Sequence, residues 1–221
     1  MDALDRLAEP GLDLLVRVDT LLAAGVPEGH RIWPLLRRMQ VLPGDAVREF
    51  LDLHPAPLAT AGHAVRRLVR RYDDACATLA APVAWSGPAA SAYDEARAAL
   101  LRHLDEGPES LVGRLESTAG YADALADWVA GSRLALARAL AEVLRSAEAV
   151  TVLAAAPRGG ETGSAGVLAA AEIAVRVLGV LGVAYDGAET LLRHWSPGLA
   201  ESTWRERTGG GSHQDASLRI G

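Results

Sequence analysis

The feature that most constrains this chain is a run of apolar residues spaced alternately three and four positions apart. This spacing places the side chains on one stripe of an α-helix, and such a helix needs another helix to cover its stripe. The rest of the chain shows the same helical period almost throughout, and almost no segment alternates with period two. The sequence therefore predicts an all-α fold. The stripe consists of Leu58, Ala61, Val65, Leu68, Tyr72, Ala75 and Leu79.

Proline and glycine divide the region around this stripe into separate helices. Pro82 ends the first helix, and Pro88 begins a second one at a position where a missing N–H costs nothing. Gly107-Pro108 interrupts the second helix, and a longer helical pattern follows it. We expect residues 57–156 to form a long antiparallel helical hairpin that bends between the two prolines.

Further helical segments lie on both sides of the hairpin. The N-terminal region, 1–56, is predicted to contain three helices, of which the first begins near Gly11 and the last is capped by Asp45. A Pro/Gly-rich linker leads to a C-terminal helix over residues 165–196, and the tail 208–221 is expected to be disordered. We expect the helices of both termini to pack along the hairpin.

Composition excludes several kinds of chemistry. All 22 basic residues are arginines, which excludes a Schiff-base lysine and a phosphate-loop lysine. The single cysteine, Cys76, excludes an internal disulfide, and none of the six histidines has a second one at helical zinc-site spacing. The net charge of −6 disfavours nucleic acid as a partner. We therefore expect no enzymatic activity, no cofactor and no metal.

Targeting features are weak. Four acidic residues among the first 17 argue against a cleavable signal peptide. The segment 165–185 is long enough to cross a membrane, but it contains Glu172 and Arg176 at the spacing of an ion pair on one helix face. We expect a buried amphipathic helix there and no membrane span. The lysine-free, Ala/Arg-rich composition is typical of a GC-rich genome such as that of an actinobacterium.

The bend of the predicted hairpin carries the tripeptide Trp85-Ser86-Gly87. Gly87 tolerates the positive φ that a tight helix–helix turn requires, and Trp85 offers a large apolar surface for packing across the end of the hairpin. A helix, this tripeptide in a short turn, and a second helix together resemble the Trp-x-Gly (WXG) helical-hairpin superfamily of type VII (ESX) secretion. The resemblance covers about Pro57–Glu106, and more loosely it extends to Ala156.

The resemblance implies two further properties. Members of this superfamily pair with a second hairpin into a four-helix bundle, and they leave the cell without a cleavable signal peptide. One member of a pair carries a Tyr-x-x-x-Asp/Glu signal beyond its second hairpin helix, and Tyr185 and Glu189 match that signal here. The chain differs from the simplest members because some 56 residues precede its first hairpin helix and another helix follows the linker.

A cluster of arginines, Arg66, Arg67, Arg70 and Arg71, is the densest charge feature. It is either a solvated helix face or a docking patch for an acidic partner. Taken together, these patterns predict a type VII secretion-associated substrate or component that packs against another helical-hairpin protein or a second copy of itself, and that contacts the ESX export motor. The alternative is a cytosolic helical adaptor, chaperone or immunity-type protein that binds a secreted partner. The expected location is accordingly either secreted or cytoplasmic.

Overall fold

The computed structural model describes residues 1–82, 84, 86–155 and 161–200. Within these residues the secondary structure is entirely helical, and the all-α prediction is confirmed. The predicted tail 208–221 lies outside the described residues. The helices are α1 (Ala3–Ala23), α2 (Ile32–Met39), α3 (Pro43–Asp52), α4 (Pro55–Ala80), α5 (Pro88–Asp105), α6 (Leu111–Leu144), α7 (Ala147–Ala154) and α8 (Glu161–Ala200).

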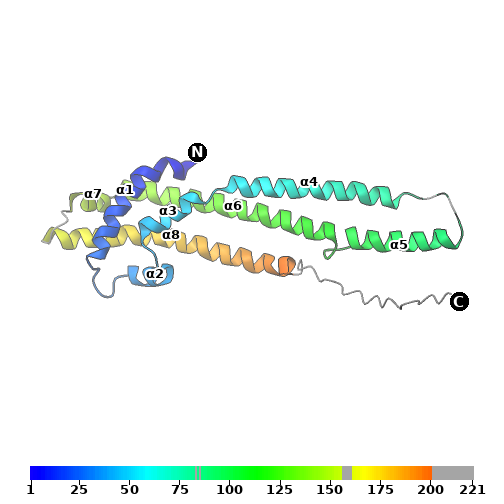
Figure 1. Cartoon of the computed structure of the whole chain (residues 1–221). Coiled ribbons are helices and arrows are strands. Elements are labelled where there is room, and N and C mark those ends of the chain that lie inside the picture. The colour runs from blue at the N-terminus through cyan, green and yellow to red at the C-terminus, as the bar shows by residue number, and fades with distance from the viewer. Residues whose placement is uncertain (83, 85, 156–160, 201–221) are drawn as a thin grey trace, which may run out of the picture.

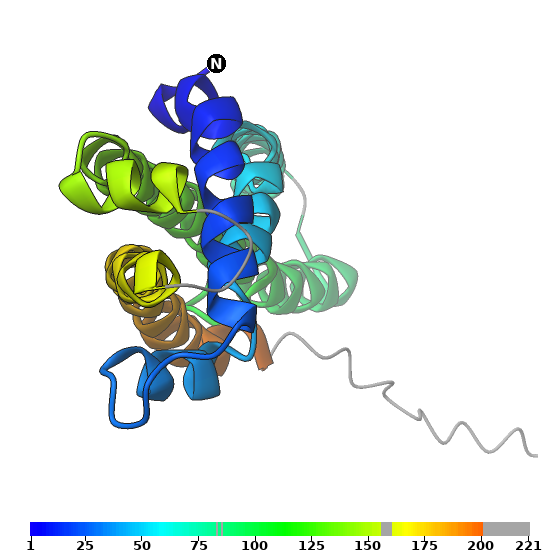
Figure 2. The ribbon, with the colours of Figure 1, turned by 90° about the vertical axis from the view of Figure 1, so that its left-hand side faces the viewer.

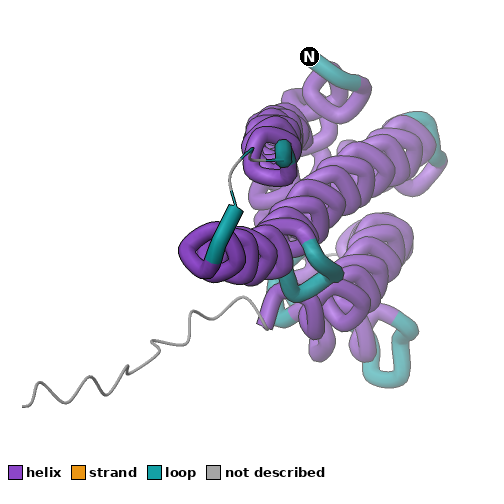
Figure 3. Tube along the Cα trace, turned by 90° about the vertical axis from the view of Figure 1, so that its right-hand side faces the viewer, coloured by secondary structure: helices purple, strands orange, loops and turns teal. Residues whose placement is uncertain are grey.

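The molecule is elongated, with most of its helices gathered at one end (Figure 1). Helix α6 lies along the middle of the molecule and packs against α8 and against α4, and α5 continues the line of α6 beyond the end of α8. Helix α1 crosses the bundle, and α2 lies along α8 (Figure 2). Of the described helices, only α4 and α5 reach the opposite end, which faces the viewer in Figure 3.

The main core joins the N-terminal region to the later helices. Leu15 of α1, Phe50 of α3, Leu136 of α6 and Ile173 of α8 are almost fully buried in one apolar cluster. The alanines that α8 contributes to this cluster let its neighbours approach closely. Helices α1–α3 are therefore built into the same core as α6–α8.

Helix α1 begins earlier than the predicted start near Gly11. Asp2 forms a capping box, in which its carboxylate accepts the backbone N–H groups of Leu4 and Asp5 while Asp5 accepts the N–H of Asp2. The helix continues through Pro10, although a proline inside a helix removes one backbone hydrogen bond. Burial of Leu4 and Leu14 against the core compensates for that loss.

The predicted cap on α3 was wrong. Asp45 makes no capping hydrogen bond and instead pairs with Arg48 at 2.6 Å (Oδ1 to Nη1). The cap comes from another helix, because the Asp19 carboxylate of α1 accepts the N–H of Gly44 at 3.1 Å. A cap supplied from 25 residues away has no local sequence signal.

Two other boundaries differ from the prediction. The long helical pattern after Gly107-Pro108 is broken between α6 and α7, where Ser146 caps α7 by accepting the N–H of Ala149 at 3.2 Å. Helix α8 extends past the predicted end at residue 196 and includes Pro197 within its last turn. Because Pro197 lacks an N–H, the last turn of α8 loses the hydrogen bond to the carbonyl four residues earlier.

Helix α8 is the one described helix that is long and apolar enough to cross a membrane by length and composition. The stretch Ser164–Pro197 reaches a mean hydropathy of 2.1 in its most apolar window, and 61% of that window is buried inside the protein. The expected ion pair between Glu172 and Arg176 does not form. Glu172 instead pairs with Arg31, and Arg176 pairs with Glu148 of α7 at 2.7 Å.

Candidate interaction surface

Helix α4 packs against α6 with a different row of residues from the one predicted. The buried positions are Gly62, Val69 and Cys76, which are seven residues apart. Gly62 suits this rotation, because a Cβ there would lie 2.6 Å from Oδ1 of Asp123 on α6. The predicted stripe is therefore covered along one edge only. Each buried residue at that edge comes one position after a residue of the predicted stripe.

The other edge of the stripe faces solvent. Ala61, Leu68 and Ala75 are exposed, and the Leu68 side chain is 43% accessible. Val65 and Tyr72, between the two edges, are partly covered. Among the described residues, helix α4 thus carries an apolar band of which one edge is buried and the other is left to solvent. We call Ala61, Leu68 and Ala75 the open row.

The connection from α4 to α5 reverses the chain where the hairpin bend was predicted. Gly87 has φ +115°, and its carbonyl accepts the N–H of Ala90 at 2.9 Å, with Pro88 at the first turn of α5. The Arg97 guanidinium donates to the Ala81 carbonyl at 2.6 Å and holds the connection against α5. Ser86 is exposed. Trp85, the predicted packing residue of this bend, lies outside the described residues.

Helix α5 contributes little to any core. Ala90 is its only buried residue, whereas Leu100 is 44% accessible. An open groove of about 640 Å³ separates α5 from the end of α4, and carboxylates of Asp73 and Asp105 line it. The distal end of the molecule is therefore a two-helix arm with apolar and acidic side chains at its surface.

The predicted arginine patch separates into two parts. Arg66 is partly buried and forms an ion pair with Asp123 across the α4–α6 contact, and this hydrogen bond lowers the pKa of the Asp123 carboxyl. Arg67, Arg70 and Arg71 are exposed, and none of them forms an ion pair with another described residue. Three of the four arginines thus remain as a surface feature of α4.

The predicted Tyr185 and Glu189 signal lies on α8 where α3 covers it in part. The Tyr185 ring is 43% accessible and packs edge-on against Phe50, with a centroid distance of 6.5 Å. Its neighbour Asp186 pairs with Arg38 of α2. The Glu189 side chain is 70% accessible and lies 3.8 Å from Arg193. The two residues share a helix face, but only Glu189 projects freely from it.

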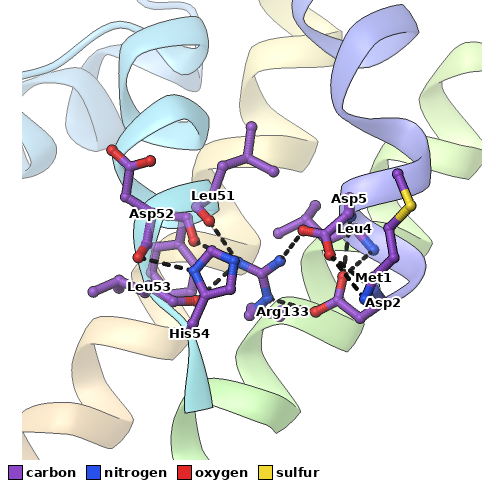
Figure 4. Close-up of polar contacts among 10 residues, drawn as sticks. Met1, Asp2, Leu4, Asp5, Leu51, Asp52, Leu53, His54 and Arg133 are labelled. Atoms are coloured by element: carbon purple, nitrogen blue, oxygen red, sulfur yellow. Dashed lines mark hydrogen bonds and ion pairs between the residues drawn. The ribbon is translucent and has the colours of Figure 1, made fainter. Parts of the chain in front are cut away.

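A buried arginine was missed by the sequence analysis. Arg133 of α6 is only 1% accessible, and its Nη1 donates to the carbonyls of Phe50, Leu51 and Leu53 at 3.1, 2.9 and 2.8 Å (Figure 4). On its other side the guanidinium binds the carboxylates of Asp2 and Asp5. Its hydrogen bond lowers the pKa of Asp2 to about 2. This residue joins the start of α1 and the end of α3 to α6.

Comparison with known proteins adds no assignment. No protein-family model, curated protein or solved structure shows a significant match to this chain. Within the described ranges, no three His, Cys, Asp or Glu side chains gather closely enough to hold a metal ion. The open row and its flanking charges are therefore the candidate functional site among the described residues.

Proposed function

We propose that this chain is a type VII (ESX) secretion-associated helical protein that acts by packing the open row of α4 against a second helical hairpin. The observation that carries the proposal is the uncovered apolar edge of α4, the helix that precedes the chain reversal at Gly87. The positive φ of Gly87 in that connection supports the resemblance to the WXG superfamily. The proposed role requires no catalytic step.

Apolar burial would supply the affinity for the partner. Leu68 is 43% accessible, and covering the exposed remainder of its side chain stabilises a complex by about 1 kcal/mol. The exposed arginines beside the row would favour an acidic partner over other partners, and their contribution would be to specificity more than to affinity. A helix that is apolar on one edge and acidic on its flanks fits this surface.

Export would depend on the signal residues of α8. Glu189 is accessible to another protein without any change in fold, while Tyr185 presents one edge of its ring beside Phe50. We assign these two residues to recognition by the export motor. Burial of much of α8 and the ion pairs of Glu172 and Arg176 support a core helix within the exported protein.

The alternative is a cytosolic adaptor, chaperone or immunity-type protein that binds a secreted partner. One observation favours it, namely that α1–α3 share a core with α6–α8 and make the chain larger than a simple hairpin. A protein of this kind would use the same open row, but Glu189 would have no role. The two functions therefore differ in the fate of the chain and in the effect of changing Glu189.

Export can be measured directly. The protein is expressed in a host with a functional ESX system, and culture filtrate is compared with a strain that lacks the export motor. We expect motor-dependent protein in the filtrate, its loss in Glu189→Ala, and normal export of Glu142→Ala, which changes an exposed acid on α6. Absence from the filtrate, or release that persists without the motor, contradicts the secretion role. Cytosolic protein that captures a secreted hairpin supports the alternative.

A further inference from the structure

The open row of α4 is flanked by a charge pattern that is complementary to itself. Arg67 and Arg71 lie on the outer flank of the row, and Asp74 lies on the same flank one turn further along the helix. All three side chains are exposed, and none forms an ion pair with another described residue. One helix edge thus carries a pair of cations and an anion next to Leu68 and Ala75.

We infer that a second copy of this chain docks on α4 in the antiparallel orientation. Leu68 of each copy packs against Ala75 of the other, and Asp74 of each copy lies between Arg67 and Arg71 of the other. This inference rests on the proposed function for its surface, and it names the partner that the surface takes.

The register follows from helix geometry. When two antiparallel helices place Leu68 opposite Ala75, Asp74 of one copy lies level with Val69 of the other. Val69 is midway between Arg67 and Arg71, so the carboxylate is offset from each arginine by two residues, or about 3 Å along the axis. Arginine side chains span that offset easily. The two-fold symmetry then repeats the same contact on the other side of the axis.

Side-chain size supports the same register. A large residue opposite a small one fills the interface without overlap, and the two-fold axis supplies this Leu–Ala pair twice. A parallel two-fold arrangement would instead place this charged flank of each copy beside the flank of the other copy that α6 covers, so Asp74 would meet neither Arg67 nor Arg71. Charge therefore selects the antiparallel dimer over the parallel one.

Charge exchange provides the test. The full chain and its variants are examined by sedimentation velocity over a micromolar concentration series. We expect a wild-type dimer that weakens as salt is added. Asp74→Arg places three arginines together, and the double variant Arg67→Asp/Arg71→Asp places three aspartates together, so each self-association weakens at least about tenfold. When the two variants are mixed, every contact is again between opposite charges, and the heterodimer should regain wild-type affinity.

Matched controls separate this contact from general effects of charge or folding. Arg70→Asp changes an exposed arginine of α4 that lies on the far side from Leu68, about 160° around the helix, and it should dimerise normally. Leu68→Glu should abolish the dimer, and circular dichroism should show unchanged helix content in all variants. A monomeric wild type, a dimer that survives Asp74→Arg and Leu68→Glu, or failure of the mixture to recover overturns the inference.

The export assay keeps this inference distinct from the function on which it rests. Sedimentation reports the dimer, and culture filtrate reports secretion. If the charge-exchanged variants form a heterodimer but the protein is not exported by the motor, the dimer inference stands and the secretion role is contradicted. If the protein is exported but is a monomer, the secretion role stands and the dimer inference is contradicted.

Discussion

Arg133 and Asp2 lie 131 residues apart in the sequence and are joined by a hydrogen bond of 2.6 Å between Nε and Oδ2. Asp2 also caps α1, so one carboxylate both begins a helix and anchors it to α6. The opposite edge of the same guanidinium donates to the carbonyls of Phe50 and Leu53 at the end of α3. This contact locates the N-terminal region on the bundle.

Replacing Arg133 should destabilise the whole fold. Arg133→Met keeps an apolar stem but removes the donor that the carbonyls of Leu51 and Leu53 share in a partly buried site. Asp2 is partly exposed and can be solvated, so we expect a loss of about 3 kcal/mol in the free energy of unfolding by urea. Arg138→Met, at an exposed position of the same helix, should change it by less than about 0.5 kcal/mol. Equal stability of the two variants would contradict this role.

Asp19 should make stability depend on pH. Burial raises the pKa of its carboxyl from 3.8 to about 6, against the opposing hydrogen bond from Gly44. Because the folded pKa is the higher one, its protonated form favours folding, and this contribution is complete below pH 3.8 and is lost as pH rises through 6. Asp19→Asn should remove this component, worth about 2 kcal/mol after allowance for partial exposure.

The measurement is the free energy of unfolding by urea between pH 4 and pH 7, for wild type and for Asp19→Asn. Asp13→Asn on the exposed face of α1 serves as the control and should follow the wild-type profile. Parallel profiles for wild type and Asp19→Asn would show that the carboxyl does not titrate in this window.

Two glycines of the long helices should respond oppositely to alanine. A Cβ at Gly62 would lie 2.6 Å from Asp123, so Gly62→Ala must displace α6 or break the Arg66–Asp123 ion pair. We expect a net loss of about 1 kcal/mol in stability despite better helix propensity. Gly131 has open space around its Cβ position, and Gly131→Ala should gain up to about 1 kcal/mol. Thermal unfolding of both variants distinguishes packing from propensity, and a gain at both positions would refute the close approach.

Phe50 should connect the N-terminal helices to α6 and α8. Its ring is 1% accessible and meets Trp128 edge-on at a centroid distance of 6.1 Å. Phe50→Ala removes a large buried aromatic and should cost about 3–5 kcal/mol in unfolding free energy. Leu53→Ala, at a 40% accessible position, should cost much less. Urea denaturation followed by tryptophan fluorescence provides the comparison, and a minor effect of Phe50→Ala would place its ring outside the core.

Local patterns were sufficient to predict several features of the chain. The break at Gly107-Pro108 occurs as expected between α5 and α6, and the burial of Cys76 agrees with its position beside an apolar stripe. Both depend on interactions within one or two helical turns, where proline, glycine and helical periodicity act. The open row itself was predicted as part of the stripe, but its exposure was not.

The features that the sequence did not predict are contacts between residues that lie far apart in the chain. Arg133 lies on a helix with many apolar neighbours, and nothing nearby indicates that its partners are Asp2, Asp5 and three carbonyls of α3. The assignment of Arg66 to a patch failed for the same reason, because its partner Asp123 comes 57 residues later. The spacing of Glu172 and Arg176 predicted a local pair, but Glu172 pairs with Arg31, just before α2, and Arg176 pairs with Glu148 of α7.

The amino-acid order alone determined that this chain would be helical, where it would be interrupted, and which residues would form an apolar band on α4. Those properties come from backbone preferences and periodicity, which act between near neighbours. Only the tertiary structure decided which edge of that band α6 covers and which edge it leaves to solvent. The decision rests on the fit between α4 and α6, where Gly62 leaves room for the Asp123 side chain, and such a fit depends on side chains from two helices that are far apart in the sequence.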